Sequence, residues 1–377
     1  MSGKDLNELR LLIDAADRDL VDAFVRRMEV AGEIAEAKRE IGKAVFDPAR
    51  ERLKLDSVEK LAGEKMGKYT RSLYSLLMEL SKDHQNRILN NERTVLEVRD
   101  EPFPTSARVA CQGTAGAYSE LAARTLFAEP EIEFCASFED VMRMVSEGKV
   151  RYGVLPIENS NAGCVEAVYS LLNRYGVYIV REVKCAVRHS LLAKRGTRLC
   201  DVREVISHGQ AISQCSEFLG AHPEMRVTYA ENTAVAARLV AESDRGDVAS
   251  LSSHLCAELY GLCELERDVQ DTDNNRTRFL CVSREPELYP DADKTSIIIA
   301  TENVPGALYM VLSRFFALGI NITSLVSQPI HGGDFESRFY LDFESRVSSN
   351  DLAALLDIVP TMCREFKYLG TYLGSVG

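Results

Sequence analysis

The sequence lacks several features that would assign a protein to a class at once. Its 377 residues include no tryptophan, no cysteine pair spaced C-x-x-C and no uninterrupted apolar run long enough to cross a membrane. The first ten residues are polar and charged, so no secretory signal is predicted. The ten cysteines are scattered singly, which favours free thiols in a reducing cytoplasm over a disulfide framework or a zinc site. We therefore expect a cytoplasmic protein with no membrane partner and no metal site.

No part of the chain is basic either. The net charge is −12; residues 1–95 carry 18 basic and 18 acidic side chains, residues 96–293 carry 21 and 31, and residues 294–377 carry 6 and 8. Neutralising nucleic-acid phosphates requires a positively charged face. The charge distribution therefore argues against a nucleic-acid partner, and an anionic ligand would have to be bound by a few placed cations.

Proline is nearly absent from the first quarter of the chain, where only Pro48 precedes residue 100. Two polar stretches that carry proline, residues 97–106 and 284–294, are predicted to be linkers. A content of 46% hydrophobic and 27% charged residues is typical of globular domains. We predict three domains, at residues 1–96, 107–284 and 294–377.

The first domain is predicted to be all helical. Apolar residues recur every three or four positions, and no proline interrupts residues 4–41. Asp47 and Pro48 are the N-cap and first-turn residues of a second helix, and a third is expected from about Tyr69 to Glu92. The first helix would be ~57 Å long, whereas a domain of this size has a radius of gyration of only ~12 Å. Such a helix cannot bury its apolar face against its own chain alone, so we infer that this domain dimerises.

Three cations lie on this first helix. Arg27 and Lys38 are 11 positions apart and share a face to within ~20°, whereas Arg10 lies ~100° away from that face. Arg10 could therefore serve a site in the other protomer. From spacing alone, the alternative interpretation is ordinary ion pairing on a helix surface.

The order of these residues resembles the all-helical chorismate mutase domain, over about residues 5–90. The resemblance begins with Leu9-Arg10-x-x-Ile13-Asp14-x-x-Asp17-x-x-Leu20. The eight polar positions that fit the family are Arg10, Arg27, Lys38, Asp47, Arg50, Glu51, Ser81 and Gln85. In that family two protomers intertwine and each site borrows one arginine from its partner, a role that Arg10 fits.

The resemblance implies the rearrangement of chorismate to prephenate. This reaction is unimolecular and pericyclic, so the site has to hold a folded dicarboxylate and stabilise charge on the breaking ether oxygen. Arg10, Arg27 and Arg50 would then face the carboxylates, and Lys38 and Gln85 the ether oxygen. Asp47 and Glu51 would take the ring hydroxyl or orient the cations.

The middle domain alternates between apolar runs and helical patterns. Strands are expected at residues 108–111, 152–157, 177–180, 204–207 and 278–282, with helices at 138–149 and 210–221 among them. This is an α/β pattern with a largely buried sheet. Ligands in such folds bind at loops beyond the ends of the strands.

Four motifs in this domain resemble prephenate dehydratase over about residues 107–284. They are Gly113-Thr-Ala-Gly-Ala-Tyr-Ser-Glu120, Pro156-Ile-Glu-Asn-Ser-Asn-Ala-Gly163, Ser207-His-Gly-Gln-Ala-Ile-Ser-Gln-Cys215 and Asn275-Arg-Thr-Arg-Phe279. Taken singly, each has a plain alternative, such as a helix entry, a capped turn or a loop histidine. The glycine-rich turn matches neither dinucleotide-binding nor P-loop patterns.

The resemblance implies a two-lobed fold like that of periplasmic binding proteins and the conversion of prephenate to phenylpyruvate. The family assigns the hydrogen-bond donor for the departing hydroxyl to the threonine of Thr-Arg-Phe, here Thr277, with Arg278 as a candidate for a carboxylate and Phe279 completing the motif. The remaining candidate cleft residues are Thr114, Ser119, Glu158, Asn159, Ser160, Ser207, His208, Gln210 and Gln214.

The last domain is expected to follow the order β-α-β-β-α-β of a ferredoxin-like fold, with a turn at residues 331–334. It resembles the ACT regulatory domain attached to this dehydratase. Gly306, Ala307 and Leu308 match the stretch where backbone N–H groups can hold an amino-acid carboxylate. The family's Glu-Ser-Arg-Pro signature is Val326-Ser327-Gln328-Pro329 here, so only Ser327 and Pro329 are kept. We therefore expect weak phenylalanine inhibition or none.

The sequence thus predicts a bifunctional enzyme with chorismate and prephenate as substrates, no cofactor, phenylalanine as a candidate effector and a homodimer or higher oligomer as its assembly. Two alternatives stay open. One is a dehydratase with a mutase-like domain kept for dimerisation, and the other is a non-enzymatic amino-acid sensor. Arogenate is also an open alternative to prephenate.

Overall fold

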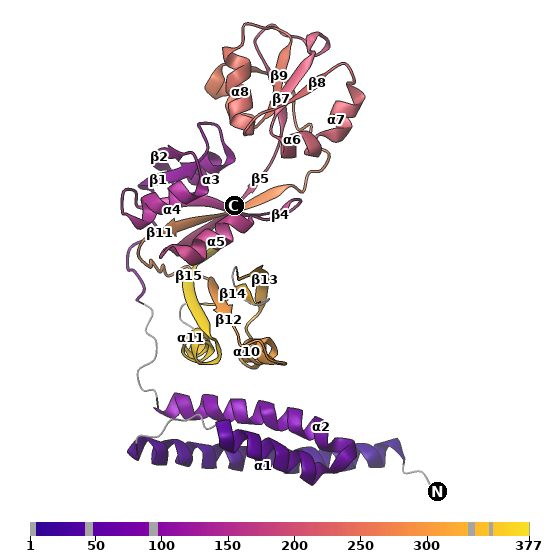
Figure 1. Ribbon diagram of the computed structural model, residues 1–377, viewed down its shortest axis with the longest axis vertical. Helices are drawn as coiled ribbons and strands as arrows, with labels where there is room; N and C mark the ends of the chain where they lie inside the picture. Colours follow the sequence, from indigo (N-terminus) through magenta and orange to yellow (C-terminus); the bar gives the residue numbers. More distant parts are fainter. Residues whose placement is uncertain (1–4, 42–47, 90–96, 331–335, 347–349, 377) are drawn as a thin grey trace. The chain divides into compact units, whose positions relative to one another are not determined.

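The computed structural model describes residues 5–41, 48–89, 97–330, 336–346 and 350–376. The chain divides into two compact units (Figure 1). The first comprises Met1–Val95 with Leu308–Arg314 and Ala353–Thr361, and the second comprises Leu96–Ala307, Phe315–Leu352 and Met362–Gly377. No helix in these described ranges is long and apolar enough to span a membrane.

The N-terminal part of the first unit consists of α1 (Leu6–Glu40) and α2 (Pro48–Leu89). The long first helix is confirmed. A break in α2 at Gly63, where φ is 71° and ψ is 175°, separates two helices. The expected third helix is therefore present, but it begins just after Gly63 and not near Tyr69; its expected end at Glu92 lies outside the described residues. Glycine takes a positive φ at no steric cost, which lets the chain turn there. The expected start of the second helix at Asp47 lies outside the described residues.

The two helices pack through one face of α1. Ala31 and Ala35 are buried there, and a Cβ added to Gly32 would lie 3.1 Å from Ile88 of α2. Elsewhere along α1, large apolar side chains are left in solvent; most lie toward its N-terminal end, among them Leu9, Ile13, Leu20 and Val25, and Ile34 is exposed as well.

The second unit contains a sheet in the order β13-β14-β12-β15-β5-β11-β3-β1-β2, with β4 paired to β3. Its dehydratase-like strands are β1 (Ser106–Gln112), β2 (Glu129–Cys135), β3 (Tyr152–Asn159), β4 (Gly163–Cys164), β5 (Tyr178–Ala186) and β11 (Arg276–Ser283). The helices of this lobe are α3 (Tyr118–Leu126), α4 (Phe138–Ser146) and α5 (Glu166–Arg174). All the strands expected in this lobe are present.

A second lobe has its own sheet in the order β10-β6-β9-β7-β8. Its strands are β6 (Ser190–Ala193), β7 (Glu204–Ser207), β8 (Arg226–Tyr229), β9 (Val248–Ser252) and β10 (Cys263–Glu266). Its helices are α6 (Gly209–Gln214), α7 (Ser216–Ala221), α8 (Thr233–Glu242) and α9 (Leu255–Tyr260), with a short 3-10 turn at Leu199–Asp201. The single helix expected at 210–221 is therefore two, separated at Cys215. The chain passes from one lobe to the other twice, between β5 and β6 and between β10 and β11.

The C-terminal strands are β12 (Lys294–Ala300), β13 (Ile322–Pro329), β14 (Ser337–Glu344) and β15 (Glu365–Val376), with α10 (Ala307–Ala317) and α11 (Asn350–Met362). This is the expected βαββαβ order, although the turn at 331–334 lies outside the described residues. β15 also pairs in parallel with β5, which joins this sheet to the dehydratase-like sheet. The contact is close at Gly370, where φ is 141° and an added Cβ would lie 2.2 Å from the Ile179 carbonyl oxygen.

The two stretches predicted as linkers pair with each other. Val98 and Leu288 form a β-bridge, and the Arg99 N–H donates to the Leu288 carbonyl at 2.8 Å. Leu288 and Tyr289 are buried, so the second stretch packs as part of the fold.

Candidate active sites

The Thr277 hydroxyl lies in a hydrogen-bond network on β11. Nδ2 of Asn159 donates to Thr277 Oγ1 at 2.9 Å and to Asn275 Oδ1 at 2.8 Å. The side-chain oxygen Oδ1 of Asn159 accepts from the Asn161 and Ala162 N–H groups at 3.0 and 2.9 Å, which fixes the orientation of the amide. The Thr277 oxygen therefore acts as an acceptor toward Asn159, and its own hydrogen remains available to donate.

Arg278 points away from the space that Thr277 faces. Thr277 is opposite Asn159, and Arg278 is opposite Glu158, in the antiparallel pairing of β11 with β3. Successive side chains of a strand project from opposite faces of the sheet. The structure thus brings together Thr277 and Asn159 on one face and Arg278 and Glu158 on the other, and it does not bring the Arg278 guanidinium to Thr277.

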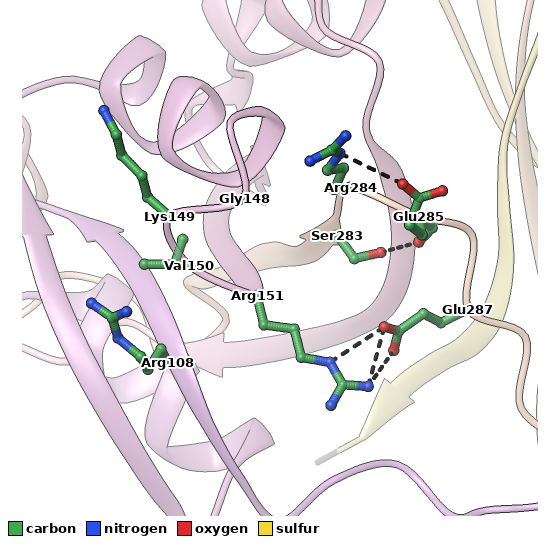
Figure 2. Close-up of a pocket in the computed structure, with 9 residues that line it drawn as sticks. All are labelled: Arg108, Gly148, Lys149, Val150, Arg151, Ser283, Arg284, Glu285 and Glu287. Atoms are coloured by element: carbon green, nitrogen blue, oxygen red, sulfur yellow. Dashed lines mark hydrogen bonds and ion pairs between the residues drawn. The ribbon is translucent and has the colours of Figure 1, made fainter.

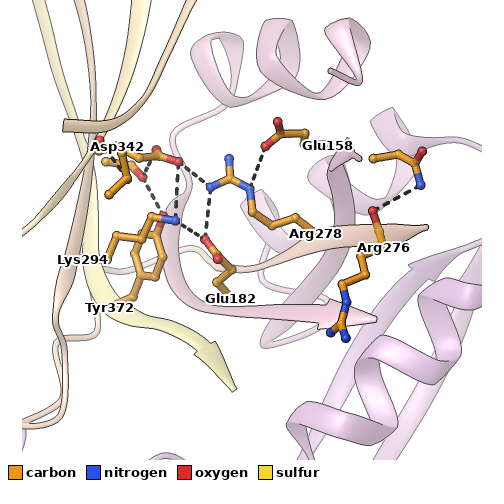
Figure 3. Close-up of polar contacts among 10 residues, drawn as sticks. Glu158, Glu182, Arg276, Arg278, Lys294, Asp342 and Tyr372 are labelled. Carbon is orange, nitrogen blue, oxygen red and sulfur yellow. Dashed lines mark hydrogen bonds and ion pairs between the residues drawn. The ribbon is translucent and has the colours of Figure 1, made fainter. Parts of the chain in front are cut away.

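Arg278 is held by carboxylates of the chain itself (Figure 3). Its Nη1 lies 2.5 Å from Asp342 and 3.2 Å from Glu182, and its Nε lies 3.5 Å from Glu158. Burial alone would lower the pKa of Arg278, but the Asp342 and Glu182 charges outweigh it and raise the pKa. Burial would likewise raise the pKa of Asp342, but Arg278 and Lys294 bring the net shift downward. Arg278 and Asp342 are therefore both ionised at neutral pH.

Ser160 and Phe279, which belong to the same two motifs as Asn159 and Thr277, stabilise the strands. The Ser160 hydroxyl donates to the Asn274 carbonyl at 2.9 Å and accepts from the Arg276 N–H at 3.0 Å, so it clamps the start of β11. Phe279 is buried in the apolar core of the sheet.

In the second lobe, two of the predicted cleft residues make hydrogen bonds to the backbone. Ser207 is buried and donates to the Leu251 carbonyl at 2.6 Å, which ties β7 to β9. His208 is exposed and caps α6, with Nδ1 accepting from the Gln210 N–H at 3.3 Å. Gln210 is exposed as well. At the start of α3, Ser119 is buried, and the nearby Thr114 Oγ1 is buried with no hydrogen-bond partner within the described part of the chain.

Sequence reasoning missed His189, which lies where the chain crosses between the lobes. Its ring faces Gln214 Oε1 at 3.0 Å through Nε2, and its backbone N–H donates to Gln270 at 2.9 Å. His189 is 2% exposed, and burial lowers its pKa. His189 Nδ1, Gln270 Nε2 and Asn275 Nδ2 have no hydrogen-bond partner among the residues the structure describes. No sequence motif marks His189, because its partners Gln214 and Gln270 are 25 and 81 positions away. Asn275, by contrast, lies inside the motif of Thr277, two residues before it.

The helices gather part of the predicted mutase set. Arg27 Nη1 donates to the Leu77 carbonyl of α2 at 3.1 Å. Ser81 and Gln85 are buried on α2, with Gln85 Nε2 donating to Ser81 Oγ at 3.3 Å. The side-chain oxygen Oε1 of Gln85 is buried with no hydrogen-bond partner in the described ranges. Lys38 is half-buried on the same face of α1 as Arg27, Ala31 and Ala35.

The remaining mutase positions are more exposed. Glu51 Oε1 forms an ion pair with Lys82 at 3.3 Å, and Arg50 is exposed on the first turn of α2. Arg10 is also exposed, and 17 residues of helix place it ~25 Å along α1 from Arg27. Asp47 lies outside the described residues. Within one protomer Arg27 and Lys38 thus share a face of α1 and Ser81 and Gln85 lie together on α2, whereas Arg10 is distant from Arg27.

The predicted effector residues lie on two elements. Gly306 has a φ of 87° and directly precedes α10, which begins at Ala307 and Leu308. Ser327 and Pro329 are exposed on β13. Val326, which stands where the family has glutamate, pairs with Tyr340 on β14 and packs against a buried apolar cluster that the C-terminal strands share with the dehydratase-like lobe.

A surface cavity of about 420 Å³ lies at the other end of β3 from Asn159 (Figure 2). Its cations are Arg108, Lys149, Arg151 and Arg284, each within ion-pair distance of a carboxylate of the chain. It also contains Ser283, which is opposite Tyr152, seven residues and ~23 Å along the strand from Asn159. This cavity is therefore separate from Thr277.

Two family models match separate parts of the chain. Residues 9–86 match the family model of chorismate mutase type II, and residues 109–287 match that of prephenate dehydratase. The class defined by fold and sites is thus a fusion of a helical mutase with a two-lobed dehydratase. A bifunctional chorismate mutase/prephenate dehydratase of Escherichia coli strain K12 is 34% identical over 384 residues, covering 98% of this chain and 97% of the relative. The chain belongs to this bifunctional family.

Two solved structures resemble the second unit's fold. GqqA, described as a novel type of quorum quenching acylase, has a TM-score of 0.66 and 33% identity, covering 71% of this chain and 98% of that one. The prephenate dehydratase of Arthrobacter aurescens in complex with L-Phe has a TM-score of 0.65 and 27% identity, covering 70% and 89%.

The burial of His189 predicts a pH-dependent loss of stability. The unfolded chain binds a proton on this histidine near pH 6.5, whereas the folded imidazole resists protonation, so stability falls as the pH drops below that value. The slope for one group is at most ~1.4 kcal/mol per pH unit. Melting temperatures measured between pH 8 and pH 5 should fall less steeply for His189→Gln than for the wild type.

His254→Gln is the matched control, because His254 is exposed on the same lobe. It should keep the wild-type pH dependence. If His189→Gln and wild type show equal slopes, the titrating group is another residue.

Proposed function

We propose that Thr277 is the hydrogen-bond donor of the dehydratase and that Arg27, Lys38 and Gln85 form the core of the mutase site. The enzyme rearranges chorismate to prephenate and then converts prephenate to phenylpyruvate, as its family does. The ten cysteines are free, which fits our inference of a cytoplasmic enzyme. The observation that carries the dehydratase assignment is the donation from Asn159 to Thr277 Oγ1.

In the dehydratase step the C4–OH bond and the C1–carboxylate bond break. The electrons of the carboxylate bond move into the ring, which becomes aromatic, while carbon dioxide and hydroxide leave; the hydroxide takes up a proton from solvent and becomes water. The departing hydroxyl needs a proton or a strong hydrogen bond, and a free threonine hydroxyl is a poor acid. Donation from Asn159 polarises the Thr277 hydroxyl, since linked hydrogen bonds strengthen one another. Asn275 Nδ2, adjacent to the network, is proposed to contact the substrate.

In the mutase step no bond to the protein forms. The site lowers the barrier by holding the dicarboxylate in its folded conformer and by stabilising the negative charge that develops on the ether oxygen. We assign the carboxylates to Arg27 and to Arg10 of the partner subunit, with Arg50 as a further cation. Lys38 and Gln85 donate to the ether oxygen. Asp47, Glu51 and Ser81 orient these groups or take the ring hydroxyl.

We predict that Thr277→Ala stops the second reaction and spares the first. Prephenate should accumulate from chorismate, because the mutase helices are unchanged while the dehydratase has lost its donor, a loss of roughly 10²–10³-fold in kcat. Thr277→Ser keeps the hydroxyl and should retain more activity than alanine. The measurement is phenylpyruvate absorbance in base, with chorismate and then prephenate as the substrate.

The same assay separates the alternatives. A dehydratase whose helices only dimerise would act on prephenate and leave chorismate unchanged, and a sensor would turn over neither. Arogenate offered in place of prephenate tests the substrate preference. Equal activities of the alanine and serine variants would refute the donor role of Thr277.

We propose that the helices of two protomers pair along the exposed apolar side of α1 and complete each other's mutase sites. Arg10→Ala and Lys38→Ala should each abolish mutase activity alone while leaving prephenate turnover intact. After mixing and subunit exchange, about half of the dimers are mixed, and each of these has one sound site, so about a quarter of normal activity should return. The measurement is chorismate consumption before and after exchange.

If no activity returns although exchange is demonstrated by mass, Arg10 serves the site of its own chain. The Lys38→Ala homodimer incubated alone is the control.

We propose that residues 294–377 form an ACT regulatory domain and that phenylalanine inhibits the dehydratase weakly. Its support is the βαββαβ order, together with the L-Phe complex of the Arthrobacter relative. Backbone N–H groups at Gly306, Ala307 and Leu308 do not depend on side chains, and Ser327 and Pro329 are kept. Val326 and Gln328 replace two charged groups, and losing such bonds removes ~1.5–3 kcal/mol each from the effector's differential affinity.

The corresponding prediction is a shift in the phenylalanine titration of prephenate turnover. The double variant Val326→Glu/Gln328→Arg should be inhibited at concentrations lower by one decade or more. Tight inhibition of the unmodified enzyme, unchanged in the double variant, would show that these two positions do not set the affinity.

A further inference from the structure

The charged cluster around Arg278 draws its members from beyond the dehydratase match. That match ends at residue 287, yet two of the groups that neutralise one another here are Lys294 on β12 and Asp342 on β14 (Figure 3). Lys294 Nζ lies 2.7 Å from Glu182 and 3.8 Å from Asp342. The C-terminal strands therefore contribute directly to the environment of the Thr-Arg-Phe motif.

The cluster is almost completely withdrawn from water. The side chains of Arg278, Glu182 and Asp342 are 9%, 1% and 12% exposed, and only Glu158 opens to solvent at 43%. Burying such ions is expensive, and apolar residues of similar size often stabilise a fold as well or better. A buried cluster at this place is thus poorly explained by stability alone.

Asp342 is itself held in a fixed position. Its Oδ1 accepts from the Ser296 hydroxyl at 2.6 Å, and that hydroxyl also contacts the Tyr372 hydroxyl at 2.7 Å. Its Oδ2 contacts Arg278, the residue next to Thr277 in the chain. Fixing the Arg278 side chain on one face of β11 restrains the backbone from which Thr277 projects on the other face.

We propose that Asp342 is a positioning residue of the dehydratase, which acts through Arg278 to hold Thr277 in line with its substrate. The proposal rests on the assignment of Thr277 as the donor. Without the Asp342 charge, Arg278 turns toward Glu158 and Glu182, and the restraint on β11 at Thr277 is relaxed. Misplacement of a catalytic group by ~1 Å can cost up to ~100-fold in rate.

The test is a double-mutant cycle on the full-length enzyme with prephenate as the substrate. Asp342→Asn keeps the shape of the side chain and removes its charge, and should lower kcat by ~10- to 100-fold with little change in KM. Arg278→Gln should lower kcat as well. In the Arg278→Gln background, Asp342→Asn should cost no further activity, because Asp342 acts only through Arg278. Additive losses in the cycle would overturn the proposal.

Matched controls separate positioning from loss of folding. Glu344→Gln changes an exposed carboxylate on the same strand and should leave kcat unaltered. Ser296→Ala keeps every charge but frees the Asp342 carboxylate, and should lower kcat severalfold with the melting temperature preserved. If Asp342→Asn does not fold, the Ser296→Ala result decides: an unaltered kcat there refutes the positioning role.

The outcome is distinguishable from a failure of the donor assignment. Normal kcat in Asp342→Asn together with inactive Thr277→Ala would refute the positioning role alone. Normal turnover by Thr277→Ala would refute the donor role, whatever Asp342→Asn does.

Discussion

The antiparallel pairing of β11 with both β3 and β5 is the constraint on which the arrangement of Thr277 and Arg278 depends. It places Thr277 opposite Asn159 and Arg278 opposite Glu158 in one register. A slip of one residue would exchange the faces of both pairs and place a guanidinium where the hydroxyl belongs. Two features stabilise this register. One is the pair of hydrogen bonds that Ser160 makes at the start of β11, and the other is the set of buried carboxylates that bind Arg278.

Because of this pairing, the two faces of β11 carry different kinds of side-chain contact. The face with Thr277 carries neutral hydrogen bonds through Asn159 and Asn275, whereas the face with Arg278 carries ions. Separating them keeps the guanidinium from binding the Thr277 oxygen directly. It also lets β14 and β12 contact the motif without blocking the face on which the reaction is proposed to occur.

Local patterns in the sequence predicted most elements, because helices and strands follow from periodicity and from capping residues. The long α1, the strands of the dehydratase-like lobe and the βαββαβ order all follow from such patterns. The break at Gly63 was missed, because a positive φ at a lone glycine depends on how the two parts of α2 pack. The split at Cys215 was missed because both halves of the segment have helical periodicity.

The sites were predictable to the extent that motifs are contiguous. Thr277 and Asn159 each stand in a motif, and their contact follows once β3 and β11 are neighbours. The opposite orientation of Arg278 was available from strand alternation, but its partners were not. Glu182 and Asp342 are 96 and 64 positions away, and only the tertiary fold brings three strands to one guanidinium. His189 was missed for the same reason, since its significance lies in burial at the crossing between lobes.

The proposed sites of the two activities differ in what holds their residues in place. The dehydratase-like site is built within one chain, where a continuous sheet fixes each group by register. The helical site has no sheet to fix it, and α1 alone separates Arg10 from Arg27 by ~25 Å. Because α1 also leaves Leu9, Ile13 and Leu20 in solvent, the surface that destabilises an isolated protomer is the surface along which Arg10 would reach a second site. Association of two α1 helices would therefore cover these apolar residues and bring Arg10 to the second site through the same contact.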